Sequence, residues 1–402
     1  MNIQKINFLL LKQDIFGGIT AAVVALPLGL AFGVSSGLGA LTGLYGAIFV
    51  GFFASLFGGT PKQISGPTGP MTVVVALIFI EFNFRPEIVF FCISLAGLFQ
   101  IIFGISKLGN FVKKIPHAVV SGFMTGIGVI IISLQLPVLI GLGNSSSVIL
   151  SLIKLNNFFN FNSQAVIVSF FCLLCLFFVP YKISKIIPVP IIVLILGTTL
   201  SFLFFNQQDI IETIPKGIPK IIFFFPEIQE VPKILFYAIL LALLGIIDSL
   251  LTSIIADQIT KDQHRPNKET IGQGIGNLLS GLFGGLAGAG ATMRTVVNIK
   301  AGGQTKLSGM IHAFVLLLIV LFLSPIAEII PLSVLASILI KVGIDIIDWD
   351  FFKNCHKKSL LNILTTVLVI FLTVFVNLVI AVLVGVLFYF FLNFILKIIH
   401  SS

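Results

Sequence analysis

The sequence predicts an all-α polytopic membrane protein whose fourteen membrane segments form a seven-plus-seven inverted repeat with two broken half-helices. Three observations predict this fold class: apolar stretches recur along the chain, the same short motifs recur in both halves, and two glycine-rich breaks interrupt the apolar pattern. With 57% hydrophobic and 10% charged residues, the composition excludes an ordinary soluble protein. We therefore expect the chain to lie in a lipid bilayer.

Apolar stretches of spanning or half-spanning length run from Phe16 almost to Lys397. A helix that crosses a bilayer needs about 20 predominantly apolar residues. In the first half the expected segments are 16–36, 41–58, a broken 66–82, 88–106, 116–140, 165–180 and 187–206. In the second half they are 234–258, 271–284, a broken 290–302, 307–324, 327–346, 360–376 and 378–397. The polar stretch 207–233 is the expected extracytoplasmic connection between residues 1–206 and residues 234–402.

Internal similarity supports this division into halves. Three motifs of the first half return in the second half in the same order, as pairs 56–59 with 282–285, 66–75 with 288–297, and 116–128 with 331–343. Any one of these matches has little weight in so biased a composition, but three in order indicate a repeat. Because seven spans per half is an odd number, the second copy must be inverted relative to the first.

The basic residues indicate the orientation of the chain. With the N-terminus inside, the loops predicted to be cytoplasmic hold Lys107, Lys113, Lys114, Lys182, Lys185, Lys261, Arg265, Lys268, Lys300, Lys306, Lys353, Lys357 and Lys358. The opposite loops hold few basic residues, except in 207–233, where acids accompany them. This positive-inside pattern predicts an inner (plasma) membrane protein with both termini in the cytoplasm. The charges are scattered over short loops, so we expect no nucleic-acid partner.

The two glycine-rich breaks, 66–72 and 288–295, predict a binding site. Irregular backbone at membrane depth is tolerated where it lines a cavity, and paired breaks in matching halves are a pointer to a transporter's site. A helix that starts at such a break exposes free N–H groups and the positive end of its dipole, so two facing starts would bind an anion. Thr68 and Thr292 can add hydroxyl donors. The alternative is that the small residues simply let helices pack closely.

Asp248 lies within the otherwise apolar segment 234–258, where a carboxylate costs at least ~2.5 kcal/mol on insertion scales. Thr252 is four residues further on, on the same helix face. A carboxylate, a hydroxyl and a nearby backbone carbonyl suit Na⁺, whereas the carboxylate alone would suit H⁺. The alternatives are an acid at the cytoplasmic end of a shifted helix, or a structural partner for Arg294.

Arg294 follows the second break directly and has three possible roles. It can anchor the anion, pair with Asp248, or stand at the inner mouth of the path. Two further polar residues have simpler expected roles: Asn277 hydrogen-bonds between helices and His117 begins a helix. The sequence contains neither a GxxxxGK[ST] loop, nor HExxH, nor a serine nucleophile elbow, so we expect a gradient-driven transporter rather than an enzyme.

With these residues in view, the sequence is similar to the SulP family of anion transporters along essentially its whole length. The residues that carry the similarity are Asp14-x-x-Gly17-Gly18, 25–31 (ALPLGLA), 43–45 (GLY), 65–70 (SGPTGP), 272–277 (GQGIGN) and 292–298. Within the family it most resembles the Na⁺-dependent bicarbonate transporters, through 247–253, 284–293 and 342–349.

The resemblance implies a core domain, a gate domain and a homodimer. It implies that bicarbonate binds between the two half-helix starts, near Thr68, Gly69, Ala291 and Thr292. It implies that Na⁺, the coupling ion, binds near Asp248, Thr252, Gly290 and Thr292. Family members usually carry a cytoplasmic STAS domain after the last span; since this sequence ends at Ser402, we expect that domain to be absent from it.

We therefore expect Na⁺-coupled uptake of bicarbonate. One alternative is H⁺- or Na⁺-coupled uptake of sulfate or a dicarboxylate, in which Arg294 would bind the second negative charge. Another is an uncoupled anion exchanger or channel, against which the mid-membrane position of Asp248 argues.

Overall fold

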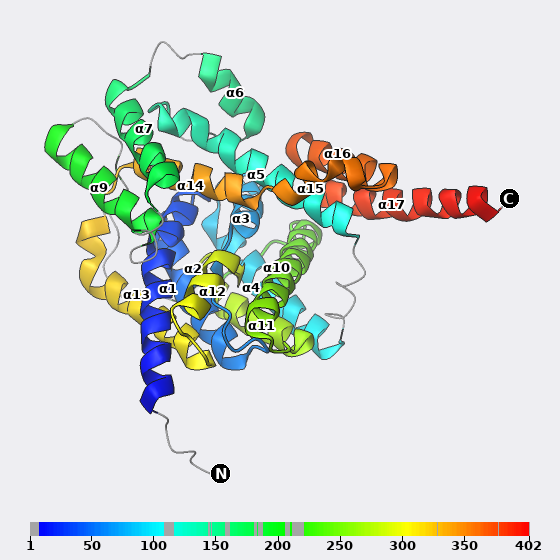
Figure 1. Ribbon diagram of the computed structural model, residues 1–402, viewed down its shortest axis with the longest axis horizontal. Coiled ribbons are helices and arrows are strands. Elements are labelled where there is room, and N and C mark those ends of the chain that lie inside the picture. Colours follow the sequence, from blue (N-terminus) through cyan, green and yellow to red (C-terminus); the bar gives the residue numbers. More distant parts are fainter. Residues whose placement is uncertain are drawn as a thin grey trace.

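The computed structural model describes residues 8–107, 116–143, 145, 147–156, 161–180, 183, 188–205, 210, 221–327, 329–376 and 378–401. Helices dominate this part of the chain (Figure 1). Each segment expected from the sequence corresponds to a helix, or to a short strand followed by a helix. The polytopic helical prediction is thereby confirmed.

The elements follow the predicted order in both halves. The first half contains α1 (Phe8–Ser35), α2 (Ala40–Phe57), β1 (Ser65–Pro67), α3 (Gly69–Glu81), α4 (Pro86–Ile105), α5 (His117–Leu139), α6 (Val148–Asn156), α7 (Ser163–Phe178) and α9 (Val189–Phe204). The second half contains α10 (Val231–Thr260), α11 (Pro266–Leu282), β2 (Gly288–Gly290), α12 (Thr292–Lys300), α13 (Lys306–Ala327), α14 (Leu332–Ile346), α15 (Trp349–Lys353), the 3₁₀ turn η3 (Cys355–Lys357), α16 (Leu360–Phe375) and α17 (Leu378–Ser401).

Five of the described helices are long and apolar enough to cross a membrane, namely Leu10–Ser35, Ala40–Phe57, Pro86–Ile105, His117–Leu139 and Val231–Thr260. Large apolar side chains also lie exposed on other helices, for example Phe202 on α9, Phe322 on α13 and Leu387 on α17. Exposed apolar surface on this scale is costly in water and suits a hydrocarbon environment.

Prolines explain where the structure differs from the expected helix boundaries. Helix α11 begins at Pro266, five residues before the expected 271, because proline is well accommodated in the first turn of a helix. Helix α14 begins at Leu332 rather than at 327, because α13 continues to Ala327 and Pro331 is the N-cap of α14. Most of the predicted connection 207–233 lies outside the described residues, which here are Ile210 and 221–233. Lys113, Lys114, Lys182 and Lys185 also lie outside them.

The helices form two groups that combine both halves of the chain (Figure 1). We call α1–α4, α10–α13, β1 and β2 the core bundle, in which α4 packs on α11 and α1 on α13. The remaining helices form the gate bundle, in which α5 packs on α14 and α16. The two bundles meet where α3 contacts α5 and where α1 contacts α14.

Residues that match in the two halves meet in space. In the gate bundle, Gly128 of α5 faces Gly343 of α14: a Cβ on Gly128 would lie 2.6 Å from the Gly343 carbonyl oxygen, and a Cβ on Gly343 would lie 3.0 Å from that of Gly128. In the core bundle, β1 pairs with β2 in antiparallel register, Gly66 opposite Ala289 and Pro67 opposite Gly288. Contact between equivalent segments of the two halves is the arrangement expected of an inverted repeat.

Candidate anion and cation site

The two predicted breaks lie side by side because β1 and β2 form a short antiparallel ladder. Each strand is followed by a helix, and because the pairing is antiparallel, α3 and α12 start at opposite ends of this three-residue ladder. Both starts lie beside α10, where Asp248 contacts Thr68 and Thr252 contacts Thr292. Their N-cap residues are Thr68 and Ala291, and among the described residues neither cap makes a side-chain hydrogen bond to its helix. First-turn N–H groups that are not capped are donors for an anion, and the helix dipoles favour negative charge there.

Thr68 leaves its helix uncapped because its hydroxyl has another acceptor. Thr68 Oγ1 donates to Asp248 Oδ2 over 2.8 Å. Both side chains are buried, and Asp248 comes from the middle of α10 in the other half of the chain. Two residues predicted separately, one for the anion and one for the cation, therefore share a hydrogen bond.

The other predicted cation ligands, Gly290 and Thr292, contact Thr252, which lies one helical turn after Asp248 on α10. Thr252 Oγ1 donates to the Gly290 carbonyl oxygen over 2.9 Å and lies 2.8 Å from Thr292 Oγ1. Together with the Asp248 carboxylate these atoms form an all-oxygen set, the donor type preferred by hard cations. Because hydroxyl and carbonyl oxygens of three elements already lie within hydrogen-bonding distance of one another, the residues present fit a small cation such as Na⁺.

Arg294 contacts strand β1 and forms no ion pair with the described residues. Its side chain is 2% exposed, and Nη2 donates to the carbonyl oxygen of Pro67 in β1. Within the described part of the chain, Nη1 has no hydrogen-bond partner, and Arg294 forms no ion pair with Asp248. The guanidinium thus places a buried positive charge next to Gly66 of the first break. A Cβ added to Gly66 would lie 2.6 Å from Nη1 of Arg294.

Buried polar side chains hold β2 in place. Asn277 accepts from the Gly288 N–H over 2.7 Å, and its Nδ2 donates to the Gly288 carbonyl oxygen and to Gln100 Oε1, each over 2.9 Å. The prediction that Asn277 bridges between elements is confirmed, although its main partner is a strand. Ser249 Oγ accepts from the N–H of Gly290 over 3.0 Å.

Sequence reasoning missed the buried carboxylate of Glu269, which is 1% exposed. The expected segment began at 271, which put Glu269 in a loop. Pro266 was the available signal, since a proline followed three residues later by an acid is typical of the first turn of a helix. Gln63 and Gln273, which contact Glu269, were missed as well.

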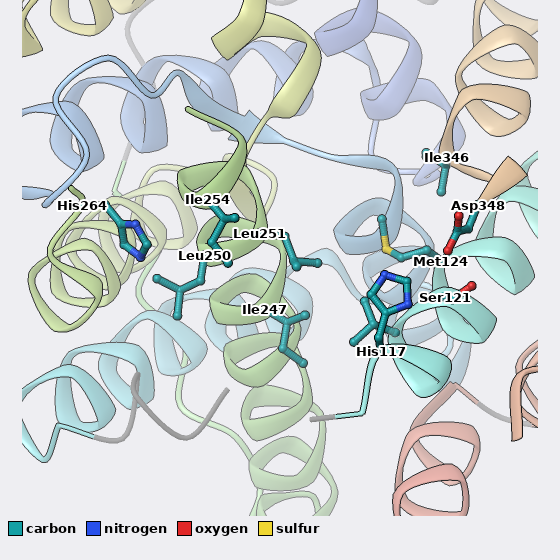
Figure 2. Close-up of a pocket in the computed structure, with 11 residues that line it drawn as sticks. His117, Ser121, Met124, Ile247, Leu250, Leu251, Ile254, His264, Ile346 and Asp348 are labelled. Atoms are coloured by element: carbon teal, nitrogen blue, oxygen red, sulfur yellow. The ribbon is translucent and has the colours of Figure 1, made fainter. Parts of the chain in front are cut away.

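The gate bundle covers the start of α3. A Cβ on Gly69 would lie 2.8 Å from Cδ1 of Ile131 on α5 and of Ile346 on α14. Ile346 also lines a cavity of about 460 Å³ between α5 and α10 (Figure 2). Apolar side chains line most of this cavity, with His117 and His264 at well-separated places on its wall. We call it the gate cavity; it separates the two bundles next to the site.

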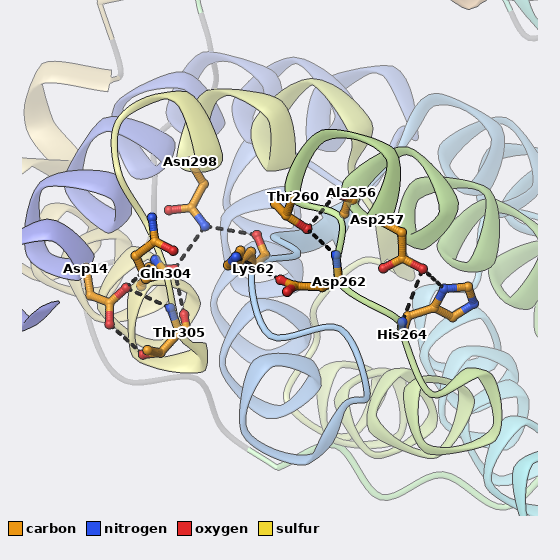
Figure 3. Close-up of polar contacts among 11 residues, drawn as sticks. Asp14, Lys62, Ala256, Asp257, Thr260, Asp262, His264, Asn298, Gln304 and Thr305 are labelled. Carbon is orange, nitrogen blue, oxygen red and sulfur yellow. Dashed lines mark hydrogen bonds and ion pairs between the residues drawn. The ribbon is translucent and has the colours of Figure 1, made fainter.

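The loops before and after the breaks are fixed by polar contacts at one end of the core bundle (Figure 3). Asp14 of α1 accepts from the N–H groups of Gln304 and Thr305, over 2.7 and 2.9 Å. Asn298 of α12 donates to the Lys62 carbonyl oxygen over 2.9 Å, and Lys62 pairs with Asp262 over 2.8 Å. These contacts fix the loop before β1 and the loops after α10 and α12 at this end of the core bundle.

Comparison with known proteins assigns the chain to a family. The profile of the Sulfate permease family matches residues 11–370. The chain is 48% identical to the bicarbonate transporter BicA of Picosynechococcus sp. over 88% of the chain and 65% of that protein, and 46% identical to BicA of Synechocystis sp. over 90% and 65%. The putative sulfate transporter YvdB of Bacillus subtilis is 33% identical over 83% and 64%. The chain thus spans about 65% of the length of the first two of these relatives.

The fold is found in solved structures. The transmembrane domain of a cyanobacterial bicarbonate transporter BicA superposes with a TM-score of 0.86 at 46% identity, covering 94% of this chain and 98% of that one. SLC26A9 superposes with a TM-score of 0.84 at 20% identity, covering 94% and 64%, which shows a shared fold. By its sequence profile and its fold, this chain belongs to the sulfate permease (SulP) family.

Proposed function

We propose that the chain is a secondary active transporter that carries bicarbonate into the cell together with Na⁺. The observation that carries this proposal is the Thr68–Asp248 hydrogen bond, since it joins the start of α3 to the carboxylate of the cation set. The similarity to BicA proteins supports bicarbonate as the anion.

Charge explains why the two ions would move together. An anion at the starts of α3 and α12 would lie close to the Asp248 carboxylate, which Thr68 contacts. Two like unit charges 4 Å apart repel by about 4 kcal/mol at an effective dielectric constant of 20. A Na⁺ ion on the oxygens of Asp248, Thr252, Gly290 and Thr292 would remove this repulsion. Each ion would then bind better in the presence of the other, and one Na⁺ with one bicarbonate would move no net charge.

Movement of the core bundle against the gate bundle would expose the site to each side in turn. Ile131 and Ile346 of the gate bundle lie against Gly69, and the gate cavity, which Ile346 also lines, approaches the site between α5 and α10. Since His264 follows the basic Lys261 and precedes Arg265, the positive-inside pattern supports a cytoplasmic opening of this cavity. We further propose that both termini face the cytoplasm and that the protein forms a homodimer in the plasma membrane.

Uptake into proteoliposomes tests the proposal. Labelled bicarbonate at alkaline pH, where little CO₂ crosses the bilayer, and labelled sulfate are each supplied with and without an inward Na⁺ gradient. ²²Na⁺ uptake with and without bicarbonate is measured in parallel, because it is independent of CO₂ leakage. We expect bicarbonate uptake to require Na⁺, ²²Na⁺ uptake to require bicarbonate, and both to be lost in Asp248→Asn, which keeps an acceptor for Thr68 but removes the charge.

A second candidate is H⁺-coupled uptake of sulfate or a dicarboxylate. It is favoured by the buried charge of Arg294, whose Nη1 has no hydrogen-bond partner among the described residues and which could help to balance a second negative charge. Sulfate uptake driven by external acid and indifferent to Na⁺ would establish this candidate and overturn the bicarbonate proposal.

A further inference from the structure

Glu269 is a second buried carboxylate in the core bundle, on α11. Its Oε2 accepts from the backbone N–H groups of Gly59 and Thr60, each over 2.8 Å. Its Oε1 accepts from the side-chain amides of Gln63, over 2.9 Å, and Gln273, over 2.8 Å. An ionised carboxylate is acceptor-only and makes strong hydrogen bonds to such donors. Four donors therefore compensate the burial of the Glu269 carboxylate, and the carboxylate fixes the orientation of the side-chain amides of Gln63 and Gln273.

The first amide, that of Gln63, contacts α10 next to the predicted cation ligand Thr252. Because Gln63 Nε2 points to Glu269, Gln63 Oε1 accepts from Ser253 Oγ over 2.9 Å. Ser253 directly follows the predicted Na⁺ ligand Thr252. Gln63 Nε2 also lies against Gly290, where an added Cβ would collide with it. Gln63 thus fills the space between α10 and β2, the two elements that carry Thr252 and Gly290.

The second amide reaches the same place from the side of β1. Gln273 Nε2 donates to Ser65 Oγ over 2.6 Å. Ser65 is the residue paired with Gly290 in the strand ladder. Glu269 is therefore connected through one side chain to α10 and through another to the strand opposite Gly290, and so holds the elements that carry the cation oxygens at a fixed spacing.

We propose that Glu269 is a positioning residue for the cation site: through Gln63 and Gln273 it sets the distance between the Gly290 carbonyl oxygen and the Thr252 hydroxyl. This inference rests on the proposed Na⁺ coupling. Glu269 is not itself a ligand of either ion in this proposal. It acts as a residue that orients metal ligands, and loss of such a residue typically lowers metal affinity by roughly 10- to 100-fold.

The test is the Na⁺ dependence of bicarbonate uptake in Glu269→Gln. A carboxamide of the same shape keeps one oxygen, which can accept from the backbone N–H groups of Gly59 and Thr60, since these cannot rotate away. Its NH₂ group then faces the amides of Gln63 and Gln273, which lose their acceptor and are expected to turn. We expect the half-saturating Na⁺ concentration to rise roughly 10-fold or more, while the half-saturating bicarbonate concentration at saturating Na⁺ stays close to that of the unmodified chain. Na⁺-induced thermal stabilisation in detergent should shift to higher Na⁺ by the same factor.

Asp14→Asn is the matched control, because Asp14 is also a buried carboxylate that accepts backbone N–H groups in the core bundle, but its partners are Gln304 and Thr305. Gln63→Met serves as a second variant in case Glu269→Gln folds poorly, and should raise the half-saturating Na⁺ concentration in the same direction. If Glu269→Gln and Gln63→Met lower the maximal rate as Asp14→Asn does, with unchanged Na⁺ half-saturation, this inference is wrong. Uptake by the unmodified chain that ignores Na⁺ would overturn both this inference and the proposed function.

Discussion

The hydroxyl of Thr68 donates to Asp248 over 2.8 Å instead of capping the helix that follows it. One hydroxyl therefore leaves N–H groups free for an anion and stabilises the carboxylate that would hold the cation. A buried carboxylate oxygen that loses its donor bears a desolvation cost of about 1–3 kcal/mol, or more because it is charged. The coupling between the two ions is thus expected to depend on this single side chain.

Thr68→Val keeps the shape of the side chain and removes the donor. We expect it to lower the rate of Na⁺-driven bicarbonate uptake about 10-fold or more at subsaturating Na⁺, because 1.4 kcal/mol corresponds to a factor of ten. Thr68→Ser, which keeps the hydroxyl, should retain most of the rate. Equal losses in the two variants would show that the hydrogen bond has no special role at this position, and an unchanged rate in Thr68→Val would contradict the prediction outright.

Four of the predicted residues contrast with their surroundings in the sequence: Asp248 and Thr252 are polar in an apolar segment, and Thr68 and Thr292 are hydroxyls within glycine-rich breaks. Gly69, Gly290 and Ala291 were implied only by the resemblance to the family. Glu269 and Gln63 have no such contrast, because both lie among polar residues near helix ends. Their role becomes visible only in the folded chain, where Gln63 Nε2 lies 2.9 Å from Glu269 Oε1 and both side chains are buried, with Glu269 1% and Gln63 2% exposed.

At the scale of elements, glycines set how closely the two halves approach. A Cβ on Gly128 would lie 2.6 Å from the backbone carbonyl of Gly343, and backbone cannot move aside as a side chain can. Helix packing in membranes depends on such small residues, because there is little hydrophobic drive between helices in lipid. The α5–α14 contact is therefore expected to tolerate no added side chain.

Gly128→Ala should lower the thermal stability of the solubilised protein by an overpacking cost of about 1–3 kcal/mol. Gly29→Ala is the matched control, since the nearest atom to its Cβ is the flexible Leu44 Cδ2 at 3.0 Å. The measurement is the midpoint temperature of unfolding in detergent. A larger decrease for Gly29→Ala than for Gly128→Ala would contradict the proposed packing.

Helix positions could be predicted well from the sequence, and the connections between elements less well. The fourteen segments follow from apolar length, and Pro86, Pro116 and Pro331 mark helix starts. The short helix α6 (Val148–Asn156) was not predicted, because its length is far below that of a span. The pairing of β1 with β2 was also not predicted, since three-residue strands of glycine and alanine have no periodic signal.

At the scale of the molecule, the gate cavity lies between two bundles that must move relative to each other if the site is to reach both sides. His117 on α5 and Ile254 on α10 line it from the gate bundle and the core bundle. The accessibility of these two positions therefore reports both the orientation of the chain and the movement.

His117→Cys and Ile254→Cys, each in a background with the native cysteines replaced, should react with a membrane-impermeant thiol reagent added from the cytoplasmic side. Na⁺ and bicarbonate together should change the reaction rate at both positions, while either ion alone should change it less. Reaction from the opposite side alone would invert the proposed orientation.

The ladder between β1 and β2 has a consequence for the direction of transport. Because the strands are paired, the starts of α3 and α12 are held in one rigid piece, and neither can retreat from a bound ion while the other stays. The part of the site that the ladder carries is then the same whichever side the site faces. We therefore expect a reversible carrier, in which the balance of the two concentration gradients decides whether the cell gains or loses the anion.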